Sequence, residues 1–472
     1  MTRSSGAIGG ISDGALAARG LAFGTAFTRP SGFTYARSLF PFDFWREAGG
    51  RVRTNFDRRA WAPTPDVTPW QTATSYYVDI TRPNDTGDGL GWATAKQSIN
   101  AAVAAGNAGA TPFIVYVRAG LYPRGQSPTG SGGSVVPNKA CAFIAVGGRV
   151  ETGHFDALGW TLDQGTTYKA SRASARRAQR IDTIDQDGLY PDYQWVADVA
   201  TCRATPGSWY TDNTTVYVNR ADGAAVTDAN TRIMLLITGG PVLAMSTGGN
   251  MYVNGFDLQG GMPAQLQGAS AYRFIAEDCS FRYGAGNDGT IGGLSAAPRN
   301  GVSVLNLLGA AFIRCDASAN QADGFNSHIQ SGVQAFVFTM DCTGFNNGRP
   351  GATSCNFITT HDGGRWIDLR GVGARNAGGQ AAIVNDGTMM WCIDTFCYAS
   401  RGDQIFGGSV PPSDFLVDQQ EGAGGSKMFL ENCAAGGSQY ALNARFGSIY
   451  VRGGKFGSAR LIANGGAVTA LS

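Results

Sequence analysis

The stretch GDGLGWATAKQSINAAV (residues 87–103), followed by IVYVRAGLY (residues 114–122), decides the fold. The first part predicts a short helix over residues 94–105, because Thr94 opens a capping box and Gly106 is placed to end the helix. The apolar side chains of this helix recur on one face. They are Ala95, Ile99, Ala102 and Val103. A helix with a single apolar stripe needs an apolar surface to cover.

The second part predicts that this surface is a stack of strands. Phe113, Val115 and Val117 alternate with the residues between them, which is the periodicity of a strand. Strand-like segments then continue to the C-terminus, with hardly any further helix. We therefore expect the helix to cover the open end of the stack, where the first strands would otherwise expose unpaired backbone groups and apolar surface.

The composition supports a long repetitive β structure. The 472 residues include 68 glycines. Of all residues, 43% are hydrophobic and only 15% are charged, a composition that fits many turns and inward-facing apolar strands. Cysteines within or after apolar strands recur with Asp-Gly turns at irregular steps of about 24 to 39 residues, apart from one cysteine step of 55 that is close to two steps of 27, a spacing typical of a β-solenoid. The cysteines concerned are Cys279, Cys315, Cys342, Cys397 and Cys433. We interpret them as small hydrophobic side chains of the interior.

Two segments resemble a known superfamily. YYVDITRPNDTGDGLGWATAKQSINAAV, with the strand IVYVRAGLY after it, resembles the entry of right-handed parallel β-helix proteins of the pectate-lyase-like superfamily. PGSWYTDNTTVYVNRADG (residues 206–223) resembles a segment that often follows in the same superfamily. The resemblance covers about residues 76–472 and implies an all-β parallel β-helix with an N-terminal capping helix. The superfamily includes lyases, glycoside hydrolases, epimerases and phage spike proteins, so the fold does not choose among activities.

We divide the chain into four parts. Residues 1–75 are rich in arginine and aromatic residues, and we expect them to anchor the protein to a larger particle or, alternatively, to pack on their own β-helix. Residues 76–148 hold the capping helix and the first coils, and residues 149–236 form a β-rich insertion with three tryptophans. Residues 237–472 form the β-helix body of about eight or nine coils. The tryptophans are Trp160, Trp195 and Trp209.

Several classes of protein are excluded by the sequence. No run of eighteen apolar residues predicts a membrane span, and Arg19 interrupts the only candidate core of a secretory signal. We therefore expect synthesis in the cytoplasm and no membrane insertion. The net charge of +2 gives no support for nucleic-acid binding. No nucleotide or metal-binding motif occurs in a supporting context, so we expect no cofactor and no metal.

The densest group of titratable and aromatic residues lies in the body. His328 and His361 occur in the similar contexts ADGFNSHIQSG and FITTHDGGRWIDLRG. The candidate catalytic residues are Asp323, His328, His361, Asp362 and Asp386. The candidate substrate-binding residues are Asn326, Asp341, Arg365, Trp366, Asp368 and Trp391.

Two reactions fit these residue types. Equivalent positions lie about 5 Å apart on adjacent coils and about 10 Å apart two coils away, close to the carboxylate separations of retaining and inverting glycosidases. Asp323, Asp362 and Asp386 could then supply an acid and a base. A β-elimination would instead use a histidine base, with Arg365 neutralising a uronate. The structural alternative is that the aspartates are turn residues, since Asp-Gly is first a turn signal.

The predicted function is that of a spike or fibre protein of a phage or phage-like particle, which attaches to host surface polysaccharide through one flank of the β-helix. The resemblance implies a tailspike-like homotrimer on the virion, with residues 1–75 bound to other particle proteins. The alternative is a polysaccharide-degrading enzyme, either a glycoside hydrolase or a lyase, that uses the Asp/His cluster.

Overall fold

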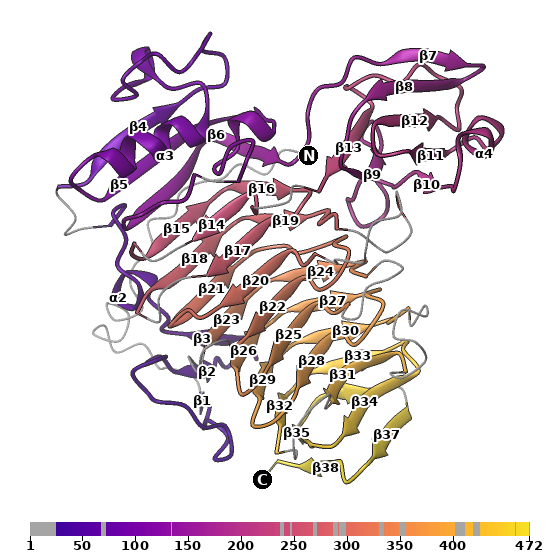
Figure 1. Ribbon diagram of the computed structural model, residues 1–472. Coiled ribbons are helices and arrows are strands. Elements are labelled where there is room, and N and C mark those ends of the chain that lie inside the picture. The colour runs from indigo at the N-terminus through magenta and orange to yellow at the C-terminus, as the bar shows by residue number, and fades with distance from the viewer. Residues whose placement is uncertain are drawn as a thin grey trace.

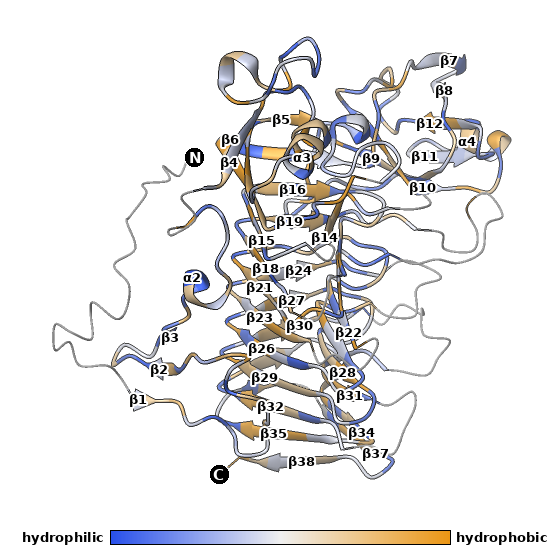
Figure 2. Ribbon diagram, turned by 60° about the vertical axis from the view of Figure 1, so that its left-hand side comes forward, coloured by the Kyte–Doolittle hydropathy of each residue, from blue (hydrophilic) through white to orange (hydrophobic). Residues whose placement is uncertain are grey.

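The structure is a computed structural model that describes residues 25–67, 72–133, 135–236, 240–245, 248–267, 271–286, 291, 299–329, 335–348, 355–401, 411–418, 425–457 and 459–471. Parallel strands are stacked as rungs from one end of the body to the other (Figure 1, Figure 2). Successive windings add a strand to each of the same sheets, so the body is a parallel β-helix. This confirms the predicted solenoid.

Three parallel sheets run along the body. The main sheet contains β4 (Thr74–Val78), β5 (Phe113–Tyr122), β6 (Cys141–Gly153), β15 (Met251–Asn254), β18 (Arg273–Glu277), β21 (Gly309–Ile313), β23 (Phe336–Met340), β26 (Arg365–Leu369), β29 (Met389–Ile393), β32 (Lys427–Glu431), β35 (Ser448–Arg452) and β38 (Ala467–Ala470). The second sheet contains β14 (Leu243–Met245), β17 (Ala264–Gln267), β20 (Val302–Leu305), β22 (Phe325–His328), β25 (Ile358–His361), β28 (Ala381–Val384), β31 (Ser413–Asp418), β34 (Tyr440–Arg445) and β37 (Ala459–Ala463). The third sheet contains β24 (Thr343–Phe345), β27 (Val372–Ala374), β30 (Phe396–Tyr398), β33 (Ala434–Gly436) and β36 (Lys455–Phe456), and β16 (Phe256–Gln259) and β19 (Ser280–Arg282) precede it.

The interior of the β-helix is filled by stacked apolar side chains. Strand residues point alternately inward and outward, and in-register pairing places like residues above one another, as with Phe325 and Ile358. All nine cysteines are buried and unbridged, and seven lie in this interior cluster. The interpretation of the cysteines as interior side chains is confirmed.

A ladder of asparagines crosses three windings beside the interior. The side-chain amide of Asn320 donates to Oδ1 of Asn347 over 3.1 Å, and that of Asn347 donates to Oδ1 of Asn376 over 2.9 Å. All three residues are buried. Because a buried amide is costly unless it is hydrogen-bonded, the ladder fixes the register of the turns that carry it. None of these asparagines was singled out by the sequence patterns described above.

Helix α3 (Ile99–Ala108) begins and ends later than predicted. Ser98 is the N-cap, its side chain accepting from the backbone N–H of Ala101, while Thr94 belongs to a short 3₁₀ turn. Gly106 lies inside the helix, where a Cβ atom would be 2.5 Å from the ring of Phe113. The glycine therefore allows close packing of helix on strand and does not end the helix. None of the described helices is both long and apolar enough to span a bilayer.

We expect Ile99→Asp to lower the free energy of unfolding by at least about 3 kcal/mol. Ile99 is fully buried and lies in one cluster with Phe113 and Val115, inward residues of the first strands. A carboxylate at this position would be buried without a partner. The measurement is chemical denaturation, and the matched control is Ala104→Asp on the exposed side of the same helix. Equal losses in the two variants would contradict a covering role for α3.

The described part of the N-terminal segment packs on the outer side of the main sheet. Strands β1 (Thr25–Ala26), β2 (Phe44–Arg46) and β3 (Val52–Thr54) form a small antiparallel sheet, and α2 (Arg58–Trp61) follows. We call residues 25–67 the arm. Its buried aromatic residues are Phe33, Phe40, Phe42, Phe44 and Trp61. They contact outward side chains of the main sheet, so the structure shows the second of the two predicted alternatives.

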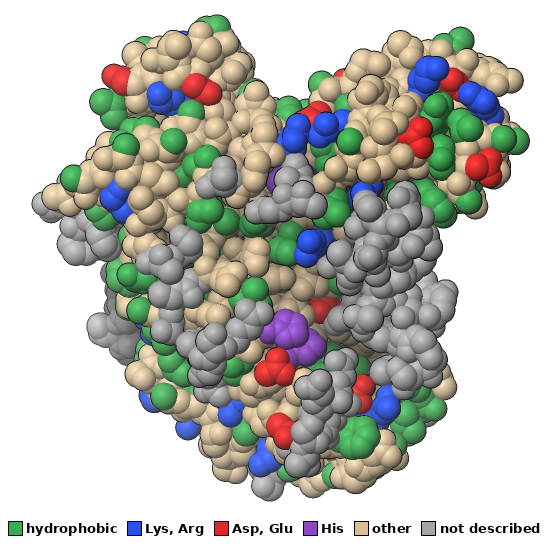
Figure 3. All heavy atoms as spheres, viewed as in Figure 1, with side chains coloured by type: hydrophobic (Ala, Val, Ile, Leu, Met, Phe, Trp, Pro, Cys, Tyr) green, Lys and Arg blue, Asp and Glu red, His purple; other side chains and the backbone are tan. Residues whose placement is uncertain are grey.

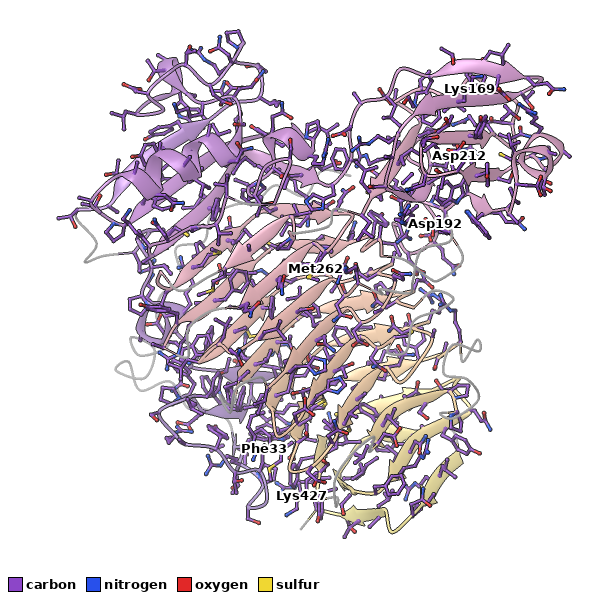
Figure 4. All side chains as sticks on the ribbon, viewed as in Figure 1. Phe33, Lys169, Asp192, Asp212, Met262 and Lys427 are labelled. Atoms are coloured by element: carbon purple, nitrogen blue, oxygen red, sulfur yellow. The ribbon has the colours of Figure 1, made fainter. Side chains whose placement is uncertain are left out.

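Polar contacts add to this packing. The guanidinium of Arg46 lies 2.8 Å from the carboxylate of Asp394, and Nε of Arg365 donates to the carbonyl of Thr34 over 2.6 Å. Figure 4 shows Phe33 close to Lys427 at the lower end of the body. The aromatic residues that suggested a docking partner thus find their apolar surface on the chain itself. Residues 1–24 and 68–71 of the predicted anchor lie outside the described residues.

The insertion is a separate β unit beside the first windings (Figure 1). Its strands are β7 (Thr161–Gln164), β8 (Thr167–Ser171), β9 (Ala175–Arg180), β10 (Gln194–Trp195), β11 (Ser208–Thr211), β12 (Thr215–Asn219) and β13 (Thr231–Leu235), with α4 (Val199–Ala204). It begins after Gly153 and not at residue 149, because β6 continues as a rung paired with β5 and β16. Asn346 of the body donates to Asp187 of the insertion over 2.7 Å, which fixes the two together.

Candidate active site on the second sheet

The second sheet brings two predicted catalytic histidines side by side. Along β22, Phe325 points into the interior, so Asn326 and His328 alternate with it in direction. Pairing of β22 with β25 then places His328 next to His361. The ring centroids of the two histidines are 4.0 Å apart and their planes differ by 14°. Figure 3 shows histidine side chains at the surface in the middle of this face, with acidic side chains beside them.

Asp362 holds the exposed histidine of the pair. Its Oδ2 lies 3.3 Å from Nδ1 of His328, and Nδ2 of Asn385 donates to its Oδ1 over 2.7 Å. Asp362 and Asn385 both have left-handed backbone conformations, with φ of 58° and 69°, which Asp and Asn tolerate better than most residues. With Nδ1 directed at Asp362, Nε2 of His328 has no partner among the described residues. The His328 and Asp362 side chains are 38% and 39% exposed.

His361 is the buried member of the pair. Burial lowers the pKa of His361 to about 3, and the neighbouring His328 acts in the same direction. Nδ2 of Asn326 lies 3.5 Å from its Nε2, which suits a neutral ring that accepts a hydrogen bond. A neutral His361 provides a flat surface for His328 without repelling a proton on it.

Asp323 is a structural residue of this site, in contrast to its predicted catalytic role. It is fully buried two residues before β22. Its Oδ2 accepts from Nδ2 of Asn326 over 2.7 Å, and its Oδ1 accepts from the backbone and side-chain N–H groups of Asn356 over 2.8 and 3.0 Å. These bonds orient Asn326 toward His361. A carboxylate enclosed in this way does not reach a polymer on the surface.

Asp386 is not the counterpart of Asp362 on the next winding. The sequences HDG and NDG suggest this equivalence, but His361 pairs with Val384, so Asn385 lies beside Asp362. Asp386 follows one residue later and is exposed. Asn385 could have been identified as a site residue only by aligning VN with HD across the two strands.

Arg365 and Trp391 lie on the opposite side of the winding, under the arm, which contradicts their predicted contact with substrate. Trp391 packs edge to face on Phe44, with centroids 5.4 Å apart. Arg365 donates to the carbonyl oxygens of Gly363 and Gly387 over 2.6 and 2.7 Å. It therefore ties together the two turns that carry Asp362 and Asp386.

The other three predicted binding residues also serve the fold. Asp341 forms an ion pair with Arg370, with an N–O distance of 2.6 Å. Trp366 and Asp368 are fully buried, and the Trp366 indole donates to Thr339 over 2.9 Å. The alternation along β26 places Trp366 and Asp368 inside the β-helix, because Ile367 and Leu369 face the arm. The sequence shows that the side chains of this strand alternate, but not whether Trp366 and Asp368 or their neighbours face inward.

We expect Asp368→Asn to raise thermal stability relative to the wild type more at pH 8 than at pH 5. Burial raises the pKa of Asp368 to about 6, against hydrogen bonds from Thr339 and Thr395, while an unfolded aspartate titrates near about 3.9. In the folded state, Asp368 therefore keeps its proton up to a higher pH than in the unfolded state, and the stability of the wild type falls as the pH rises from about 4 through 6. Asparagine has no such titration. Midpoints of thermal unfolding at the two pH values test this, and the same difference at both would contradict it.

The geometry supports proton transfer at Nε2 of His328. A histidine whose Nδ1–H points at a carboxylate is held in the tautomer that accepts a proton at Nε2. The elimination reaction loses its predicted cation, because Arg365 lies on the other side of the winding. Among the predicted carboxylates, Asp386 is exposed and lies on the turn adjacent to that of Asp362.

No protein-family model and no curated protein matches the chain. Solved structures similar to it include a complex of XylC with xylose, at a TM-score of 0.49 and 10% identity, covering 81% of this chain and 69% of that one. A glycoside hydrolase has a TM-score of 0.47 and 10% identity, with 84% and 96% covered. A rhamnogalacturonan lyase has a TM-score of 0.33 and 11% identity, with 80% and 73% covered. The residues of the site itself therefore have to carry the functional assignment.

Proposed function

We propose that the chain binds a polysaccharide across the outer face of the second sheet and the turns that follow it, and cleaves it with His328 as the proton-transfer residue. The observation that carries this proposal is the half-exposed His328, stacked on a neutral His361 and held at Nδ1 by Asp362. A fold needs no such arrangement at its surface. Oriented titratable groups that lie against a buried histidine of lowered pKa are typical of catalytic sites.

The surroundings of the histidine suit a carbohydrate. Gln265 and Gln267 lie on β17, two strands from β22 in the same sheet, and the amide of Gln265 lies 3.3 Å from that of Gln267. Two strand spacings are about 10 Å. Amide groups donate and accept hydrogen bonds at once, as sugar hydroxyls require. We infer that a glycan lies across the strands and contacts both positions.

Hydrolysis is the reaction that the site supports better than elimination. Nε2 of His328 would take a proton from the attacking water, and Asp386 would give a proton to the leaving glycosidic oxygen. The carbon–oxygen bond breaks and a new reducing end forms. Elimination would need a cation to neutralise a uronate. The predicted cation, Arg365, instead donates hydrogen bonds to backbone carbonyl oxygens of the turns.

The test is incubation of the purified chain with a panel of neutral and acidic surface polysaccharides. We expect shorter chains and new reducing ends, without the ultraviolet absorbance of an unsaturated product. Appearance of that absorbance would replace hydrolysis by elimination. Absence of any cleavage, together with no binding, would remove the proposed function.

We propose a homotrimer on a phage or phage-like particle as a second candidate. The specific observation is an apolar patch on the third sheet, where Phe396 is 42% exposed and stacks on Tyr398 with centroids 4.8 Å apart. Val372 lies beside Phe396 in register. Large exposed apolar groups are unusual on a monomer when they are adjacent. Light scattering tests this candidate, since a monomer that is unchanged by Phe396→Glu would contradict it.

A further inference from the structure

The insertion has an outer face that its own core does not use. One side of the sheet β10-β11-β12-β8-β7 packs into a buried cluster that includes Trp209, Val216 and Val218. Because strand residues alternate, Tyr210 and Tyr217 project from the opposite side. Helix α4 covers only one end of that side, where Cys202 approaches the carbonyl oxygens of Ser208 and Tyr217.

The two tyrosines form a flat aromatic surface. They are directly opposite each other on β11 and β12, their ring centroids are 6.0 Å apart and their planes differ by 30°. Both side chains are half-buried, and their hydroxyl groups have no hydrogen-bond partner among the described residues. Lys169 is next in register on β8. We call Tyr210 and Tyr217 the tyrosine platform.

The charges around the platform favour an uncharged ligand. Lys169 and Arg203 share the carboxylate of Asp163, at 3.0 and 2.7 Å, so these three groups carry one net positive charge, and Asp198 and Asp212 make the total around the platform negative. Asp198 and Asp212 act on Tyr210, whose pKa is raised by burial and by these carboxylates. Figure 4 shows Lys169 and Asp212 on the insertion, at the upper right of the molecule. An acidic polymer would meet the two exposed aspartates, whereas the hydroxyls of a neutral sugar could donate hydrogen bonds to them.

We propose that the tyrosine platform is a second carbohydrate-binding surface, specific for a neutral polysaccharide and separate from the His328 site. The apolar faces of pyranose rings stack on the phenol rings, and the tyrosine hydroxyls and the flanking carboxylates bind sugar hydroxyls. The inference rests on the proposed function in one respect, namely that the ligand of this chain is a polysaccharide. The platform would hold the polymer near the chain while His328 acts on it.

The experiment is affinity electrophoresis of the full chain in gels that contain a neutral β-glucan, xylan or polygalacturonate. We expect retention by at least one neutral polymer and none by polygalacturonate. The double variant Tyr210→Ala/Tyr217→Ala is expected to weaken retention about tenfold or more, which is the loss of one good contact. Tyr210→Phe/Tyr217→Phe keeps the rings and is expected to bind nearly as well.

The matched control is Tyr77→Ala, which removes one ring of another stacked tyrosine pair, Tyr77 and Tyr116, whose centroids are 5.5 Å apart on the body. It should leave retention unchanged. Unchanged retention in the double alanine variant, with thermal unfolding like that of the wild type, would overturn the platform. So would retention by polygalacturonate alone. A wild-type chain that is retained through the platform but cleaves no polysaccharide would contradict the proposed cleavage and still support the platform. The two proposals can therefore fail separately.

Discussion

His328→Ala should lower the rate of polysaccharide cleavage by about a hundredfold to ten-thousandfold, the usual contribution of a positioned general acid or base. His328 is 38% exposed, and its removal leaves no buried cavity, so the fold should remain stable. His361 cannot replace it, because burial lowers the pKa of His361 to about 3 and leaves it a weak base. The measurement is the initial rate of release of reducing ends, with thermal unfolding recorded for each variant.

Two further variants separate the roles in the site. Asp362→Asn keeps an acceptor near His328 but loses the charge, and we expect a smaller decrease of the rate than for His328→Ala, because the histidine is still present. Asp386→Asn should abolish cleavage of substrates with poor leaving groups if Asp386 is the proton donor. The matched control is Asp278→Asn, an exposed aspartate paired with Arg314 at 2.8 Å and far along the chain from the site. Full activity of His328→Ala would contradict the assignment of His328 as the proton-transfer residue.

The sequence indicated that His328 and His361 lie in related positions, but not which residues surround them. The similar contexts of His328 and His361 placed the two one or two windings apart, and the pairing of β22 with β25 shows that they lie on neighbouring windings. Asn385 was missed because the pairing of His361 with Val384 places Asn385, and not Asp386, beside Asp362. Trp366 and Asp368 were misplaced because an alternating strand gives two sets of side chains without saying which set faces inward.

The parts of the fold built from residues that recur along the chain could be predicted from the sequence. The packing of the arm on the β-helix, which joins residues far apart in the chain, could not. Turn residues and cysteines recur at irregular steps of about one or two windings, and this recurrence was sufficient to predict the solenoid. The asparagine ladder has the same regularity, with steps of 27 and 29 residues, and could have been found in the same way. The aromatic residues of the arm showed that an apolar partner surface was needed, but a sequence alone does not say whether that surface belongs to the chain or to another protein.

Phe40→Ala should destabilise the arm by about 3–5 kcal/mol, the usual cost of truncating a fully buried phenylalanine. Phe40 is the central residue of the aromatic cluster, because its ring lies within 5.0 Å of Phe336 and 4.9 Å of Phe338, measured between centroids. Two neighbouring arm residues, Phe42 and Trp61, also contact it. Loss of this ring removes contacts on both the arm and the main sheet, so we expect the arm to detach before the β-helix unfolds.

Limited proteolysis is the appropriate measurement, because a detached arm exposes the arginine side chains between residues 25 and 67 to trypsin while the body stays resistant. We expect cleavage within the arm to accelerate in Phe40→Ala by a factor that reflects its higher open population. Leu162→Ala is the control, since that side chain is 58% exposed on the insertion and its removal should change stability by no more than about 0.5 kcal/mol. If both variants resisted trypsin as well as the wild type, the aromatic cluster would not be what holds the arm, and its polar contacts, such as Arg46 with Asp394, would have to account for its attachment.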